Sequence, residues 1–296
     1  MRGKIVLAGL LVALAGAVAS AQNGPQVPSP NDLYCSGTVT SESIPHAAFI
    51  ITGEESNYRL SFDEGDNVYI NKGASQGVNV GDVFSVVRKV EDPYGIEWTK
   101  WQDMILKKMG TVWADEGRVR VTRVFANTSV AKVEHSCDIL QRGDTLLPFT
   151  ERPAPPLKPV ENFDQFVPAN GKPLAMIIIG KDFQSQVGRE DIVYVNLGNG
   201  QGVKVGDYFR IFRYTGTQHE TVYQDNRYAF DQDDQLAAPF FAIYGFGSAP
   251  KKYDWSNTPR EDVGEGVVLR TGPNSSTVLI TFSLREIYPG DYVELE

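Results

Sequence analysis

One stretch of the chain occurs twice, and it limits the folds that the sequence can adopt. The first copy spans residues 68–84 and reads VYINKGASQGVNVGDVF; the second spans residues 193–209, 125 positions later, and reads VYVNLGNGQGVKVGDYF. Each copy has the pattern of a strand, a glycine-containing turn, a short apolar segment and a Gly-Asp corner before another strand. Such a repeat predicts two related small β domains.

The glycines and aspartates of this stretch are expected to form its turns. Glycine allows positive φ or close backbone approach, and aspartate accepts hydrogen bonds from nearby amides in tight corners. A phosphate-binding loop would need a Gly-Lys-Ser/Thr ending and a following helix, which the pattern lacks. The expected turn residues are Gly73, Gly77, Gly81 and Asp82 in the first copy, and Gly198, Gly202, Gly206 and Asp207 in the second.

Further landmarks repeat in the same order, including Gly143-Asp144 and Gly290-Asp291 before the last strand of each half. The fold class we predict is mainly β: two tandem small β-barrel-like domains that arose by internal duplication, with one short helix in each interposed region. Spacings of three and four predict the first helix within Glu97–Met109. Five prolines in twelve residues predict a semi-rigid extended linker. The predicted segments are the first β domain at 34–149, the linker at 150–165 and the second β domain at 166–296.

The second half carries about 24 residues more than the first, at about 217–262. A long insertion in a compact domain is usually functional or disordered, and its many aromatic residues argue against simple disorder. These rings either form a platform for a sugar or peptide, or cover a barrel end or the contact between the halves. The candidate binding residues are Tyr223, Tyr228, Phe230, Phe240, Phe241, Tyr244 and Trp255.

The N-terminus has the pattern of a secretory signal peptide at residues 1–21. Arg2 and Lys4 precede an apolar segment, and Ala19-Ser20-Ala21 supplies a small-residue cleavage site. A flexible leader is predicted at residues 22–33. We therefore expect an exported protein that is periplasmic, associated with the outer membrane or extracellular, with no transmembrane helix in the mature chain.

Removal of the signal peptide leaves 26 basic residues against 37 acidic ones, which moves the formal net charge from −9 to −11. This balance argues against nucleic acid or anionic lipid as a partner bound through bulk charge. The two cysteines, Cys35 and Cys137, are expected to form a disulfide in an oxidising compartment. Two buried free thiols or an intermolecular bond are the alternatives.

The repeated pattern, a later Asn-x-Ser-x-Ala-x-Val strand and the closing Gly-Asp resemble the C-terminal domain of the bacterial flagellar T-ring (H-ring) assembly protein. Similar domains occur in envelope proteins beside peptidoglycan-binding LysM modules, although this chain has no LysM-like segment. The ending, residues 264–291, is also similar to that of uncharacterised secreted acidobacterial proteins. The resemblance implies a small β domain of the bacterial cell envelope.

The residues give no pattern typical of a catalytic or metal site. His46, His135 and His219 form no zinc motif, and His135 and Cys137 share a strand face without forming a nucleophilic pair. No Gly-x-Ser-x-Gly elbow is present. We therefore expect no cofactor, no metal and no catalytic residue: a non-enzymatic scaffold or binding module that contacts an envelope protein or peptidoglycan. The alternative is a carbohydrate-active or peptidoglycan-modifying enzyme with carboxylates that the sequence does not locate.

Overall fold

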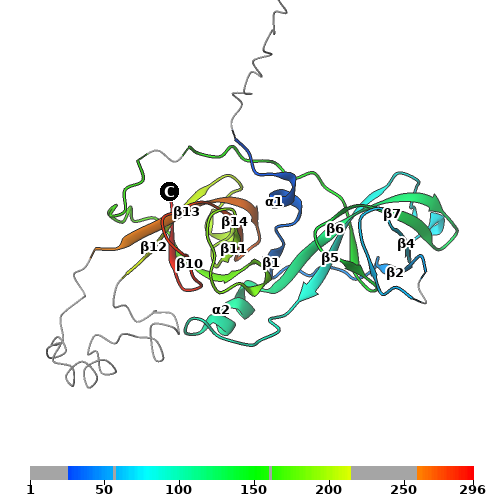
Figure 1. Cartoon of the computed structure of the whole chain (residues 1–296), viewed down its shortest axis with the longest axis horizontal. Coiled ribbons are helices and arrows are strands. Elements are labelled where there is room, and N and C mark those ends of the chain that lie inside the picture. Colours follow the sequence, from blue (N-terminus) through cyan, green and yellow to red (C-terminus); the bar gives the residue numbers. More distant parts are fainter. Residues whose placement is uncertain (1–25, 56–57, 160–161, 215–258) are drawn as a thin grey trace, which may run out of the picture.

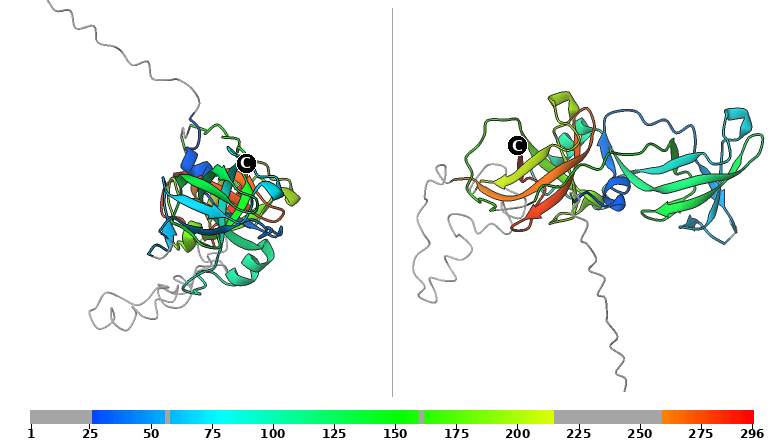
Figure 2. Two further views of the ribbon diagram at one scale, coloured as in Figure 1. Left: turned by 90° about the vertical axis from the view of Figure 1, so that its right-hand side faces the viewer. Right: turned by 90° about the horizontal axis from the view of Figure 1, so that it is seen from above.

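A computed structural model describes residues 26–55, 58–159, 162–214 and 259–296. The described chain is mainly β, as predicted, and its strands form two units side by side (Figure 1). The segment at residues 30–40, which we call the N-terminal arm, lies between the two units in both Figure 1 and the view from above in Figure 2.

The first unit is a curved sheet in the order β2-β4-β7-β6-β5-β9, with β1 paired to β6. An isolated bridge between Phe49 and Thr145 links the β2 and β9 edges, so this unit is an incompletely closed barrel. A separate two-stranded sheet joins β3 to β8. The strands are β1 (Thr38–Thr40), β2 (Ile50–Gly53), β3 (Ser61–Phe62), β4 (Asn67–Ile70), β5 (Val83–Val90), β6 (Thr111–Val124), β7 (Ser129–Ser136), β8 (Leu140–Gln141) and β9 (Thr145–Pro148).

The second unit is a closed barrel in the order β10-β11-β14-β13-β12-β15. When the six strands on each path are ranked by their order in the chain, both units have the same spatial order: first, second, fifth, fourth, third, sixth. The common origin of the two units stays a prediction. The strands are β10 (Leu174–Gly180), β11 (Ile192–Val195), β12 (Tyr208–Arg213), β13 (Glu261–Thr271), β14 (Ser276–Ser283) and β15 (Tyr292–Leu295), with a short 3-10 turn, η2 (Lys181–Phe183), after β10.

Each unit has its own apolar core, formed by alternate residues of its strands. Val68 and Ile70 of β4 point inward in the first unit, whereas Tyr69 between them is exposed. Val193 and Val195 of β11 occupy the corresponding places in the second core. A fully buried aliphatic side chain of this size contributes about 1.5–3 kcal/mol, so each unit has a core sufficient to define its strand register.

In each copy of the repeated stretch, a 3-10 turn ends at a glycine in the left-handed region. Gly77 follows η1 (Ala74–Gln76) with φ +82°, and Gly202 follows η3 (Asn199–Gln201) with φ +92°. A residue with a Cβ is strained at such φ values. Gly77 and Gly202 therefore determine where the chain turns in each unit.

The Gly-Asp corners have matching geometry in the two units. Gly81 and Gly206 have φ values of +97° and +91°. The Asp82 and Asp207 carboxylates accept hydrogen bonds from the backbone amide three residues earlier, at 2.9 and 2.8 Å. The local hydrogen bond holds the corner in which β5 and β12 begin.

Gly198 is required for a different reason, because its φ is −135° and its backbone lies against another turn. A Cβ there would lie 2.2 Å from the carbonyl oxygen of Gly272. We expect Gly198→Ala to lower the free energy of unfolding by about 1–3 kcal/mol through overpacking, measured by urea denaturation. Gly188→Ala is the control, since its Cβ would meet only Ser283 Oγ at 3.6 Å; a similar loss in both variants would contradict the prediction.

The helix expected within Glu97–Met109 is α2 (Gln102–Met109). It begins later than the spacing predicts because Trp101, its N-cap, has φ +65° and thus leaves the helical region. Gly110, with φ +127°, ends the helix against the N-terminal arm, where a Cβ would lie 2.0 Å from the Thr40 carbonyl oxygen. The helix thereby packs beside β1.

The leader predicted at residues 22–33 needs a correction at its end. Residues Pro30–Tyr34 form helix α1, capped by Ser29, whose hydroxyl accepts a hydrogen bond from the Asp32 amide. Leu33 is buried. Folded structure therefore begins before residue 34, because a proline at the helix start and a capping box favour a helix there.

The proline-rich linker is extended, but it is not a spacer between separated domains. It runs along the outside of the second barrel (Figure 1). Leu157 packs against a cluster of apolar side chains, among them Leu33 and Met176, that is buried between the two units. The Leu157 amide donates to the carbonyl of Gln26 (2.6 Å), and the Lys158 amide donates to Tyr208 Oη (2.5 Å). Packing of its few apolar side chains therefore fixes a segment whose composition predicted only extended backbone.

Two predicted segments lie wholly or largely outside the described residues: the signal peptide at 1–21 and the insertion at 217–262. β13 begins at Glu261, so the last residues of the predicted insertion belong to the barrel. The helix expected in the second interposed region and the seven candidate aromatics fall outside the described residues as well. None of the helices in the described part of the chain has the length and apolar character needed to cross a bilayer.

Candidate functional site: the contact between the two units

A third apolar cluster, which we call the interdomain cluster, joins the two units. The N-terminal arm, α2 and β6 supply one side, and the outer faces of β10, β11, β13 and β14 supply the other. Residues facing outward from the barrel, such as Ile178 and Leu269, are therefore as buried as the inward ones. The buried members are Leu33, Val39, Met109, Val112, Met176, Ile178, Ile179, Ile192, Tyr194, Val267, Leu269 and Leu279.

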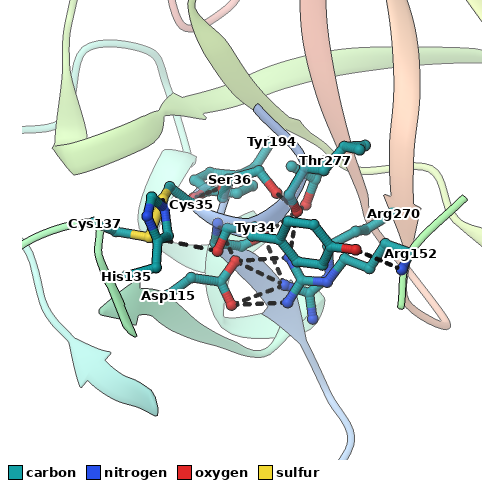
Figure 3. Close-up of polar contacts among 12 residues, drawn as sticks. Tyr34, Cys35, Ser36, Asp115, His135, Cys137, Arg152, Tyr194, Arg270 and Thr277 are labelled. Atoms are coloured by element: carbon teal, nitrogen blue, oxygen red, sulfur yellow. Dashed lines mark hydrogen bonds and ion pairs between the residues drawn. A yellow bond between two sulfur atoms is a disulfide. The ribbon is translucent and has the colours of Figure 1, made fainter. Parts of the chain in front are cut away.

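Side chains of the second barrel bind the backbone of the N-terminal arm. Tyr194 Oη donates to the Ser36 carbonyl at 2.9 Å, and Thr277 Oγ1 donates to the Gly37 carbonyl at 3.2 Å (Figure 3). Both hydrogen bonds are buried, and burial together with the negative charge of Asp115 raises the pKa of Tyr194. The phenol thus stays a neutral donor, and the bonds fix the arm on the barrel surface.

Asp115 of β6 is the centre of a charged network at this contact. Its side chain is 3% exposed and binds Arg152 of the linker through two hydrogen bonds of 3.0 Å (Figure 3). Arg270 of β13 approaches the same carboxylate at 3.2 Å, and the Gly37 amide donates to it at 2.9 Å. One buried carboxylate therefore joins the arm, the linker and both units.

Arg270 shows the electrostatic cost of this arrangement. Burial lowers its pKa, and Arg152 beside it acts in the same direction, whereas Asp115 opposes the shift. The network holds two guanidinium groups and one carboxylate. Its stability consequently depends on Asp115, because no other anion among the described residues binds both arginines, and its removal leaves two like charges in a poorly solvated place.

The structure brings Cys35 and Cys137 together in a disulfide with an S–S distance of 2.00 Å. The bond ties the N-terminal arm to the end of β7. His135 lies beside it with Nε2 3.4 Å from Cys35 Sγ (Figure 3). The sequence predicted the disulfide and placed His135 near Cys137; the fold adds the contact of His135 with Cys35, because the arm crosses this end of β7.

An interdomain cleft of about 260 Å³ opens at the disulfide. Three non-glycine residues near or on its wall have positive φ: Asp182 (+55°), Phe183 (+58°) and Glu190 (+73°). Such backbone is costly and occurs most often at functional sites. The lining residues are Asn31, Asp32, Cys35, Ser136, Cys137, Lys181, Asp182, Gln184, Glu190, Asp191 and Ile192, which carry a formal charge of −3.

A buried carboxyl group, Glu116, lies next to Asp115 in β6. Arg88 Nη1 approaches it at 3.3 Å, but burial is the larger influence and raises the pKa of Glu116 to about 7. The Asp144 carboxylate, which Arg88 binds at 2.7 Å, raises this pKa further. A pKa near 7 would allow Glu116 to act as a general acid, although it does not line the cleft.

The Glu116 pKa makes stability depend on pH. Because the folded state binds this proton more tightly than the unfolded state, the contribution is present below about pH 4.5 and is lost as pH rises through about 7. We expect Glu116→Gln to remove a fall of at most about 3 kcal/mol between pH 5 and 8, measured by urea unfolding. Glu134→Gln is the control. Arg120 lowers the pKa of Glu134, so the contribution of Glu134 to stability is lost as pH falls rather than as pH rises. Parallel pH profiles for wild type and Glu116→Gln would contradict the prediction.

A second charged group, the ionic layer, covers the outer face of the barrel where β13 begins. Arg210 binds Asp262 at 2.9 Å, and Arg260 binds Glu294 at 2.6 Å. Residues 163–168 of the chain lie over it, and the carbonyl of Val167 accepts a hydrogen bond from Arg260. The predicted insertion therefore ends at two buried charged residues, Arg260 and Asp262.

None of the eight turn residues of the repeated stretch lines the cleft, and the candidate aromatics lie outside the described residues. Sequence reasoning missed Asp115, Arg152, Tyr194 and Arg270. One signal was available: Ala175–Ile179 is continuously apolar, which is typical of a strand buried on both faces. Comparison with protein-family models gives no match, and comparison with curated proteins gives none either.

Proposed function

We propose that the protein is a non-enzymatic, exported module of the bacterial cell envelope that binds an envelope protein or the cell wall as one two-domain body. The observation that carries the proposal is the contact centred on Asp115. A buried ion pair network and a continuous apolar cluster hold the units in one relative orientation.

A fixed orientation suits a scaffold. Two units with the same strand order present related surfaces at a constant separation, so binding to a repeating partner costs little conformational entropy. The resemblance to the small β domains of envelope proteins supports the same reading.

The disulfide supports a non-cytoplasmic location, because such bonds persist in oxidising compartments. It agrees with the signal peptide that the sequence predicts. Among the described residues, the cleft walls offer carboxylates but place no serine, cysteine thiol or histidine as an activated nucleophile.

Co-sedimentation of residues 22–296 with purified peptidoglycan sacculi tests the proposal, with crosslinking in cells to capture protein partners. We expect the protein to pellet with sacculi or to form one defined crosslinked complex. A variant lacking residues 215–258 tests whether the insertion supplies the contact, and Asp115→Asn tests whether fixed orientation matters. Release of soluble wall fragments would favour the enzyme alternative, and absence of both pelleting and crosslinking would overturn the proposal.

A further inference from the structure

Cys35, His135 and Cys137 place two sulfur atoms and an imidazole within 4.8 Å of one another, and both cysteines line the interdomain cleft. In the structure the sulfurs form a disulfide, and the group holds no thiolate. His135 Nε2 lies 3.4 Å from Cys35 Sγ, and both His135 and Cys137 are only half-buried, so the group can be reached from solvent.

We propose that these three residues form a redox-gated metal site, closed as the disulfide and open to a thiophilic divalent ion of the zinc class once reduced. The opening step is thiol–disulfide exchange with an external dithiol. The dithiol supplies two electrons and two protons and becomes its own disulfide, while the protein gains two thiols. Binding of the ion then displaces both thiol protons.

One of the two sulfur–nitrogen distances already fits a zinc ion, and the second is within 4.8 Å. With Zn–S of about 2.3 Å and Zn–N of about 2.0–2.1 Å, tetrahedral sulfur and nitrogen ligands lie about 3.5 Å apart. Cys35 Sγ and His135 Nε2 are already 3.4 Å apart. The sulfurs must separate to about 3.8 Å, which reduction permits because it breaks their bond.

The cleft supplies what the three side chains lack. It leads solvent to the sulfurs, so that water can take the fourth position, as in zinc sites with three protein ligands. Asp32, Asp182, Glu190 and Asp191 outnumber Lys181 on its walls. Their negative potential attracts a dication.

The test uses the full mature chain, reduced with a phosphine that binds zinc weakly, and titrated with Co²⁺ and Zn²⁺. We expect one ion per chain, with thiolate-to-cobalt absorption, and no such binding by the oxidised protein. His135→Asn should weaken binding by at least about tenfold. His46→Asn is the matched control, because His46 binds Thr145 at 2.8 Å and lies outside the group.

Thermal unfolding of the reduced protein with and without zinc is the second measurement. Zinc should raise the midpoint of the wild type and of His46→Asn, or restore their fold if reduction unfolds them, but should do neither for His135→Asn. Equal binding by oxidised and reduced protein, binding that His135→Asn leaves unchanged, or no zinc effect on the reduced wild type would each overturn the proposal. The proposed envelope function would stand in every case.

Discussion

Replacing Asp115 with asparagine is expected to lower the free energy of unfolding by about 3–5 kcal/mol. Asparagine keeps the volume and can still accept the Gly37 hydrogen bond, so the change isolates the charge. Arg152 and Arg270, both half-buried, would then face each other without the anion that binds both. Urea denaturation measures the loss.

The same variant should also loosen the contact between the units. We expect faster proteolysis of the N-terminal arm and the linker, and a larger radius of gyration by solution scattering. Glu134→Gln, which breaks an ion pair in the first unit away from the contact, is the control and should cost about 1 kcal/mol or less. A similarly small loss for Asp115→Asn would show that the network does not hold the units together.

Replacing both cysteines with serine is expected to cost about 4–5 kcal/mol. Cys35 and Cys137 are 102 positions apart, and in the chain-entropy model a loop of this length restricts the unfolded state by that amount. The unfolding midpoint in urea, compared between the double variant and the oxidised wild type, measures the effect. The oxidised mature protein should show no free thiols under denaturing conditions.

Hydrogen exchange distinguishes the local effect of this bond from its effect on the whole chain. The disulfide holds the N-terminal arm, so β1 and the Gly37 amide should lose protection before the second core does. Uniform loss of protection would mean that the bond acts through the unfolded state alone. A midpoint unchanged from that of the oxidised wild type would contradict the predicted cost.

The sequence alone determined the features that depend on neighbouring residues. Positive φ at Gly77 and Gly202, and the Asp82 and Asp207 corners, follow from local backbone sterics and hydrogen bonds, which act over three or four residues. The strands between such turns follow for the same reason, and so does the mainly β class. The repeat in turn predicted that one strand arrangement would serve both halves.

Only the tertiary structure decided how the halves meet. Arg152 and Arg270 are 37 and 155 positions from Asp115, and neither local propensity nor spacing relates such residues. The linker shows the same limit: its prolines dictate extended backbone, but where it lies depends on the apolar surface that the barrel offers to Leu157. Burial against a distant surface is a property of the whole fold, because hydrophobic contact is non-directional and selects partners only once the units exist.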